Sequence, residues 1–197
     1  MAGYAGGGVY IRDGRAMFSG TRVVRNVATQ DGGGMSIYWG SATLSWVSVL
    51  NNTASSRGGG VHLENSSATL SASGGEISDN QADYGGGGVW SSGSVTLNEI
   101  QVLRNTTGPE GGGGVWSSGN LTLSKAYIAQ NTAPTGSAIY QAGTITPTTA
   151  LTITGNIYQA SGLFAGSSHD LRIEGALTLA GGHFYAPYEP NLFVLTG

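Results

Sequence analysis

Aromatic and imidazole side chains recur at one position of a repeated pattern, directly after an apolar residue that follows a run of glycines. Regularly spaced rings on one face of a protein can stack against sugar rings or dock a protein, because large exposed apolar patches mark interaction sites. The alternative is that the rings stack on one another or lie beneath a neighbouring loop. Ser36 holds this position in the second unit, and the ring-bearing members are Tyr10, His62, Trp90, Trp116 and Tyr140.

Hydroxyl side chains form a second recurring set, and each member is followed two residues later by Ser, Asn or Thr. A flat double row of hydroxyls on a regular β-structure resembles the ice-binding face of some antifreeze proteins. Threonine also favours exposed strand positions in general, so the row has a purely structural explanation as well. The members are Thr43, Thr69, Thr96, Thr122 and Thr152.

Asparagine forms a third set, three residues after a Val or Ile in each unit. Asparagine tolerates turn geometry and its amide can bond to the backbone. Identical amides on adjacent layers can also bond one another. We therefore expect a structural ladder rather than a catalytic role. The members are Asn26, Asn52, Asn80, Asn105, Asn131 and Asn156.

The remaining reactive residues do not suggest catalysis. The eleven Asp and Glu residues are scattered over the turns, the three histidines lie far apart, and cysteine is absent. Glycoside hydrolysis needs two converging carboxylates, and calcium-dependent chemistry needs clustered oxygen ligands. No Lys-Ser/Thr follows the glycines, as a phosphate-binding loop would require. We expect no enzymatic activity, no cofactor and no metal site.

Composition excludes further classes of protein. Eight Lys and Arg against eleven Asp and Glu give a net charge of −3, whereas nucleic-acid binders are usually basic. No apolar run approaches the roughly 18 residues of a membrane span. Met1 leads directly into small residues, without the basic and apolar regions of a signal peptide. We expect no nucleic-acid partner, no transmembrane segment and no signal peptide within this segment.

The elements that must position these side chains follow from the glycine repeat. Glycine triplets precede apolar residues at positions 9, 35, 61, 89 and 115, which are near-constant intervals with one slightly longer unit. Each unit holds three short segments of β-type composition separated by Gly, Ser and Asn turns. Such units are typical of solenoids. We predict an all-β, single-stranded, right-handed parallel β-helix of about seven coils of ~26 residues, with three short strands per coil.

Two regions differ in regularity. Residues 1–156 carry the regular repeats, whereas glycine triplets stop in residues 157–197 and Tyr, Phe, Pro and His become frequent. We expect this second region to hold irregular coils of the same domain. The segment 184–190, Phe-Tyr-Ala-Pro-Tyr-Glu-Pro, is a candidate cap or docking segment.

One unit carries a family resemblance. Residues 112–123, Gly-Gly-Gly-Val-Trp-Ser-Ser-Gly-Asn-Leu-Thr-Leu, followed by residues 128–133, Ile-Ala-Gln-Asn-Thr-Ala, resemble the repeat of bacterial right-handed parallel β-helix surface proteins. The unit is also similar to the repeats of polymorphic outer membrane proteins. The resemblance implies a secreted or cell-surface passenger or stalk used in adhesion or self-association.

The sequence thus favours an extracellular or cell-surface structural or adhesive solenoid. It would associate with itself end to end in a fibre, stalk or surface layer, or form part of a larger surface protein. The first alternative is a carbohydrate-binding or polysaccharide-active β-helix that uses the aromatic set. The second alternative is ice binding through the threonine set.

Overall fold

The computed structural model describes residues 6–149, 151–165, 169–181, 183–185 and 193–196, and these residues form three parallel sheets. The first sheet carries the apolar residue that follows each glycine run. Its eight strands, in spatial and chain order, are β1 (Val9–Arg12), β5 (Met35–Tyr38), β8 (Val61–Glu64), β11 (Val89–Ser91), β15 (Val115–Ser117), β18 (Ile139–Gln141), β21 (Ile157–Gln159) and β24 (Leu177–Leu179).

The largest sheet contains the second and third segments of each coil, which merge into single long strands in two of the coils. The merged strands are β6 (Ser41–Leu50) and β9 (Thr69–Ser78). Second-segment strands are β2 (Arg15–Ser19), β12 (Ser94–Asn98), β16 (Asn120–Ser124), β19 (Thr144–Pro147), β22 (Leu163–Phe164) and β25 (His183–Phe184). Third-segment strands are β3 (Arg22–Val24), β13 (Gln101–Leu103), β17 (Tyr127–Ala129), β20 (Leu151–Thr154), β23 (Leu171–Glu174) and β26 (Phe193–Thr196).

A small third sheet lies at the corner that precedes the next glycine run. Its very short strands are β4 (Val27–Ala28), β7 (Thr53–Ala54), β10 (Gln81–Ala82) and β14 (Thr106–Thr107). These strands give their coils a fourth strand where three were predicted, because two extended residues between turns carry no alternation pattern in the sequence.

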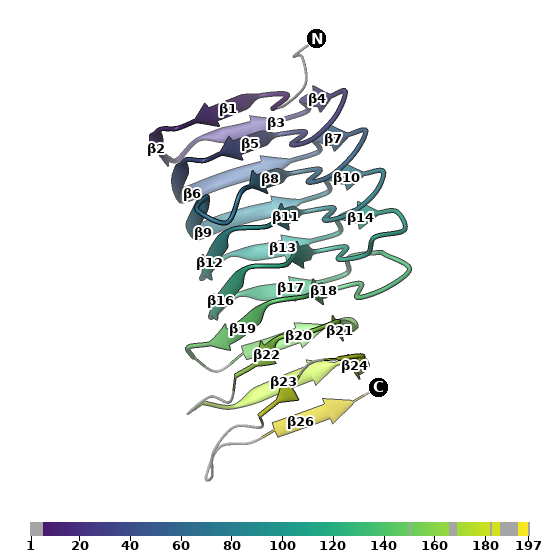
Figure 1. Ribbon diagram of the computed structural model, residues 1–197. Coiled ribbons are helices and arrows are strands. Elements are labelled where there is room, and N and C mark those ends of the chain that lie inside the picture. The colour runs from purple at the N-terminus through teal and green to yellow at the C-terminus, as the bar shows by residue number, and fades with distance from the viewer. Residues whose placement is uncertain (1–5, 150, 166–168, 182, 186–192, 197) are drawn as a thin grey trace.

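The chain winds as a right-handed parallel β-helix (Figure 1). The first sheet runs from right to left on the near side of the view, the chain returns from left to right on the far side, and each turn descends. The predicted fold class is confirmed, since all the strand pairs of the described residues are parallel and the coils repeat at intervals of roughly 26 residues. No helix long and apolar enough to cross a membrane occurs in the described part of the chain.

Coil length changes after β18. The first-sheet positions Ile139, Ile157 and Leu177 are in register, so these later coils are shorter than the coils before them. The described part of residues 157–197 nevertheless continues the two larger sheets through β21 to β26. Residues 186–190 of the expected capping segment lie outside the described residues.

The core is a narrow column of apolar side chains between the sheets. On the first sheet, Val61, Val89 and Val115 stack in register and are fully buried. On the facing strands, Ile77, Val102 and Ile128 do the same. Each coil therefore buries its apolar residues only against its own strands and those of its neighbours, as in other solenoids.

The glycine triplet of each coil serves backbone contact between coils, and residues 86–88 illustrate how. Gly86 has φ of 62°, a conformation that side chains disfavour. A Cβ on Gly87 would lie 2.6 Å from the carbonyl oxygen of Thr106, and one on Gly88 would lie 3.0 Å from Nδ2 of Asn105. The triplet thus lets the corner bend and leaves room for the asparagine amide of the adjoining strand.

Candidate functional site

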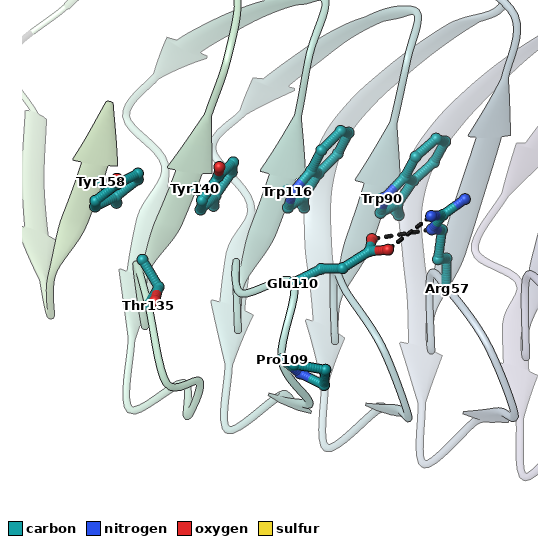
Figure 2. A pocket seen from close by; sticks show the side chains of 8 residues that line it. All are labelled: Arg57, Trp90, Pro109, Glu110, Trp116, Thr135, Tyr140 and Tyr158. Atoms are coloured by element: carbon teal, nitrogen blue, oxygen red, sulfur yellow. Dashed lines mark hydrogen bonds and ion pairs between the residues drawn. The ribbon is translucent and has the colours of Figure 1, made fainter. Parts of the chain in front are cut away.

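A ladder of five stacked rings runs along the outside of the first sheet, and Figure 2 shows its members Trp90, Trp116, Tyr140 and Tyr158. Parallel pairing aligns β8, β11, β15, β18 and β21, so the residue after each apolar position lies above its counterpart. Ring centroids are 4.8 Å apart for His62–Trp90, 4.8 Å for Trp90–Trp116, 5.8 Å for Trp116–Tyr140 and 5.1 Å for Tyr140–Tyr158. The Trp90 and Trp116 planes differ by only 4°. We call this set the aromatic ladder.

Burial within the ladder agrees with the second of the two alternatives, in which the rings stack on one another. His62 is 2% exposed and Trp90 is 8% exposed, because each lies against a neighbouring ring in the stack. Trp116, Tyr140 and Tyr158 are partly exposed. The rings therefore stack on one another, and they present mainly their edges to the surroundings.

Tyr10 belongs to the same column but stands apart from the ladder. It lies beside Ser36, which in turn lies beside His62. The small serine breaks the run of rings, and Tyr10 is 50% exposed. Tyr158 was missed by the sequence analysis because its coil is shorter than the preceding ones, so it falls outside the repeat interval.

A charged pair lies against the edge of the ladder. The Arg57 guanidinium donates to both oxygens of Glu110, with Nε–Oε2 2.9 Å and Nη2–Oε1 2.6 Å. Its Cζ lies 5.1 Å from the ring centroid of Trp90, a cation–π distance. The hydrogen bond that Arg57 donates to Glu110 raises the pKa of Arg57 above its ordinary value, against the opposing effect of burial. The pair links corners two coils apart.

An open hollow of about 450 Å³ runs beside the ladder (Figure 2). Burial, with smaller contributions from Tyr158 and Glu110, raises the pKa of the Tyr140 phenol, so the hydroxyl stays protonated near neutral pH. The hollow has a single carboxylate, and that group is already paired with Arg57. Its lining residues are Arg57, Trp90, Pro109, Glu110, Trp116, Thr135, Tyr140 and Tyr158.

The asparagine ladder is present from Asn26 to Asn131. Within it, Oδ1 of each following asparagine accepts from the backbone N–H and from Nδ2 of the asparagine one coil earlier, at 2.9–3.0 Å. From Asn52 onward, Nδ2 also donates to a carbonyl of the preceding coil, for example Asn80 to Val49 at 2.9 Å. Asn52, Asn80, Asn105 and Asn131 are buried.

Asn156 departs from the predicted ladder. Its side chain is exposed, and its Oδ1 accepts from the backbone N–H of Ala176 at 2.9 Å. Its own N–H donates to Oγ of Ser137 at 2.9 Å. The N–H of Asn156 thus bonds to the preceding coil, whereas the N–H of a ladder asparagine such as Asn80 bonds to the following coil.

The predicted threonine column is wrong at two positions. The strand register places Thr43, Ser71, Thr96 and Thr122 in one column, with Thr146 next. Thr69 instead lies beside Ser41 and Ser94. The turn after β8 is longer than the corresponding turns and is closed by a hydrogen bond from the N–H of Ala68 to the carbonyl of Asn65. Strand β9 is therefore shifted relative to the register that the sequence repeat predicts.

Thr152 is the second misplaced threonine. It lies in a third-segment strand beside Tyr127 and Arg172. The second segment of that coil is β19, which the sequence pattern did not reveal. The hydroxyl row therefore contains a serine and does not extend as predicted.

A group of potential metal ligands lies at the His62 end of the ladder. Asp31, His62 and Glu64 each offer a ligand atom, and these atoms lie within 4.8 Å of one another. Acidic residues and histidines are scattered along the sequence, but the fold brings these three together, contrary to the expectation that no such group forms. Asp31 and His62 belong to different coils, so their proximity depends on the stacking register.

Comparison with protein-family models, with curated proteins and with solved structures yields no match. The chain is a parallel β-helix repeat protein. Its architecture rests on the strand register, the asparagine ladder and the glycine corners described above.

Proposed function

We propose that the protein is a structural or adhesive solenoid of the cell surface or extracellular matrix, which associates end to end by strand addition. The observation that carries the proposal is the use of the repeated residues. Repeated valines, glycines and asparagines join each coil to the next along one axis. A fold that is stabilised mainly by contacts between successive coils suits a rod-shaped structural protein. The resemblance of the repeat to surface β-helices supports an extracellular location.

The edge of β1 is where addition would occur. Among the described strands, β1 pairs with β5 alone. The N–H of Val9 donates to Gly34 and that of Asp13 to Tyr38, both toward the second coil. Because alternate residues of a strand bond to opposite sides, the N–H of Tyr10 points to the other edge. Such edges are templates for pairing with another chain.

The test is sedimentation velocity and electron microscopy across a concentration series of the full chain. We expect elongated oligomers that grow along the coil axis. Tyr10→Pro removes one edge N–H and should weaken association, whereas the matched variant Tyr10→Ala keeps that N–H and should associate normally. A chain that stays monomeric at every concentration would contradict the proposal.

The hollow beside the aromatic ladder favours a second candidate, non-enzymatic binding of a polysaccharide. Ring edges and a tyrosine hydroxyl line it, together with a guanidinium–carboxylate pair, over about 450 Å³. Sites of this kind combine apolar walls with a few polar groups that orient the ligand. Binding on a glycan array should disappear in Trp116→Ala and persist in Trp46→Ala, which alters an exposed tryptophan that does not line this hollow. Absence of binding, or equal binding by both variants, would reject this candidate.

A further inference from the structure

We propose that Asp31, His62 and Glu64 form a binding site for one divalent transition-metal ion, with Zn²⁺ as its representative, that links two neighbouring coils. Their ligand atoms lie within 4.8 Å of one another. His62 and Glu64 are two residues apart on β8 and so project from the same face of the strand. Asp31 comes from the corner before β5, one coil earlier.

The spacing is compatible with closure on an ion. Ligand atoms about 2.0–2.2 Å from a tetrahedral Zn²⁺ lie about 3.3–3.6 Å from one another. The required movement is at most about 1.5 Å, within the reach of a carboxylate rotamer. Glu64 is exposed, so its side chain is free to make that adjustment.

His62 supplies an independent indication of a missing ligand. The side chain is 2% exposed, and its fully buried Nδ1 has no hydrogen-bond partner among the residues that the structure describes. Buried polar groups are nearly always paired, and an unpaired one is costly. Stacking on Trp90 at 4.8 Å fixes the ring plane without satisfying Nδ1. A metal ion would provide the partner that the protein lacks.

The charge around the site favours a cation. Within the described parts of the chain, neither Asp31 nor Glu64 takes part in an ion pair. Arg57 is the cation nearby, and its guanidinium is held by Glu110 in two hydrogen bonds. The backbone N–H of Arg57 donates to Oδ1 of Asp31 at 3.0 Å and so orients that carboxylate.

The donor set selects the class of ion. One imidazole nitrogen and two carboxylate oxygens suit Zn²⁺, Co²⁺ or Ni²⁺, whereas Ca²⁺ and Mg²⁺ prefer oxygen ligands throughout. Three protein ligands leave a position for water. The ion would join the Asp31 corner to β8 and so add a cross-link between coils at the end of the aromatic ladder.

The experiment is isothermal titration calorimetry of the full chain after EDTA treatment and dialysis, with ZnCl₂ and, separately, CaCl₂. We expect one Zn²⁺ per chain with Kd of about 1–10 μM, and at least tenfold weaker binding of Ca²⁺. His62→Phe keeps a flat ring against Trp90 but removes both nitrogens. Glu64→Gln alters an exposed side chain and preserves its size. Each should weaken Zn²⁺ binding about tenfold or more.

A matched control and a fold check complete the design. His183→Gln changes an exposed histidine on β25 and should leave the Zn²⁺ affinity unchanged. Far-UV circular dichroism should be the same for Glu64→Gln and the parent chain. The proposal is overturned if Zn²⁺ does not bind at about 1 mM, if Ca²⁺ binds as tightly, or if Glu64→Gln retains full Zn²⁺ affinity.

Discussion

Removal of one rung from the asparagine ladder gives the most direct test of how the coils are held together. In Asn80→Ala, four buried hydrogen bonds disappear. Oδ1 no longer accepts from the backbone N–H and Nδ2 of Asn52, both at 2.9 Å, and Nδ2 no longer donates to Val49 and Asn105, both at 2.9 Å. Since each buried bond contributes about 1 kcal/mol net, the free energy of unfolding should fall by about 4 kcal/mol.

The chain contains its own control at Asn156. This exposed residue accepts one side-chain bond, from Ala176 at 2.9 Å, so Asn156→Ala should cost about 1 kcal/mol or less. An isosteric variant separates volume from bonding. Asn80→Asp retains the shape and an acceptor but turns the donor into a second acceptor that faces Val49 and Asn105. It should destabilise the protein at least as much as Asn80→Ala.

Guanidinium unfolding followed by tryptophan fluorescence and circular dichroism measures these differences. Because a solenoid is stabilised by contacts between neighbouring coils, Asn80→Ala should also separate the unfolding of the two halves into distinct steps. Equal unfolding midpoints for the Asn80 and Asn156 variants would contradict this prediction, since they would show that the buried amides contribute no more than an exposed one.

Three further outcomes are expected. Gly86→Ala places a Cβ 2.5 Å from the Val89 carbonyl oxygen, at a residue with φ of 62°. It should reduce the free energy of unfolding by about 1–3 kcal/mol and so lower the melting temperature. In the control Gly14→Ala, the nearest atom to the new Cβ is 3.5 Å away, and the melting temperature should not change. The pKa of His62 is lowered from 6.5 to about 4 in the folded protein. Between pH 6.5 and pH 4, His62 is therefore protonated in the unfolded chain but not in the folded one. In chelator-containing buffer, stability should therefore be constant above pH 6.5 and fall by about 3 kcal/mol as the pH drops to 4, and denaturation profiles of His62→Phe should lack this loss. Since Ser71 replaces a threonine between Thr43 and Thr96 and so removes one methyl group from the column, nanolitre osmometry should detect no thermal hysteresis, and a measurable value would contradict this prediction.

Sequence periodicity predicted those features that depend on identical coils. The glycine corners, the stacked valines and the contact between Trp90 and Trp116 all follow from one interval repeated along the chain. The same interval predicted the amide ladder as far as Asn131, because an asparagine at a constant offset from a buried residue must lie above its neighbour.

Features that depend on unequal coils could not be predicted in this way. A longer turn after β8 moved Thr69 out of its column, and shorter coils brought Tyr158 onto the ladder. The approach of Asp31 to His62 depends on side-chain directions at a corner, and no spacing in the sequence encodes these. Burial of Trp90 likewise requires knowledge of the rings on both of its sides.

The change in coil length has a mechanical consequence. The hydrogen bonds between coils run along the axis, so tension applied to the two ends would peel off one coil at a time. A released coil of the regular region adds about 90 Å of contour length, whereas the shorter coils after β18 add about 60–70 Å. Force–extension records of a single molecule would then show two classes of step, and the shorter class would mark the C-terminal coils.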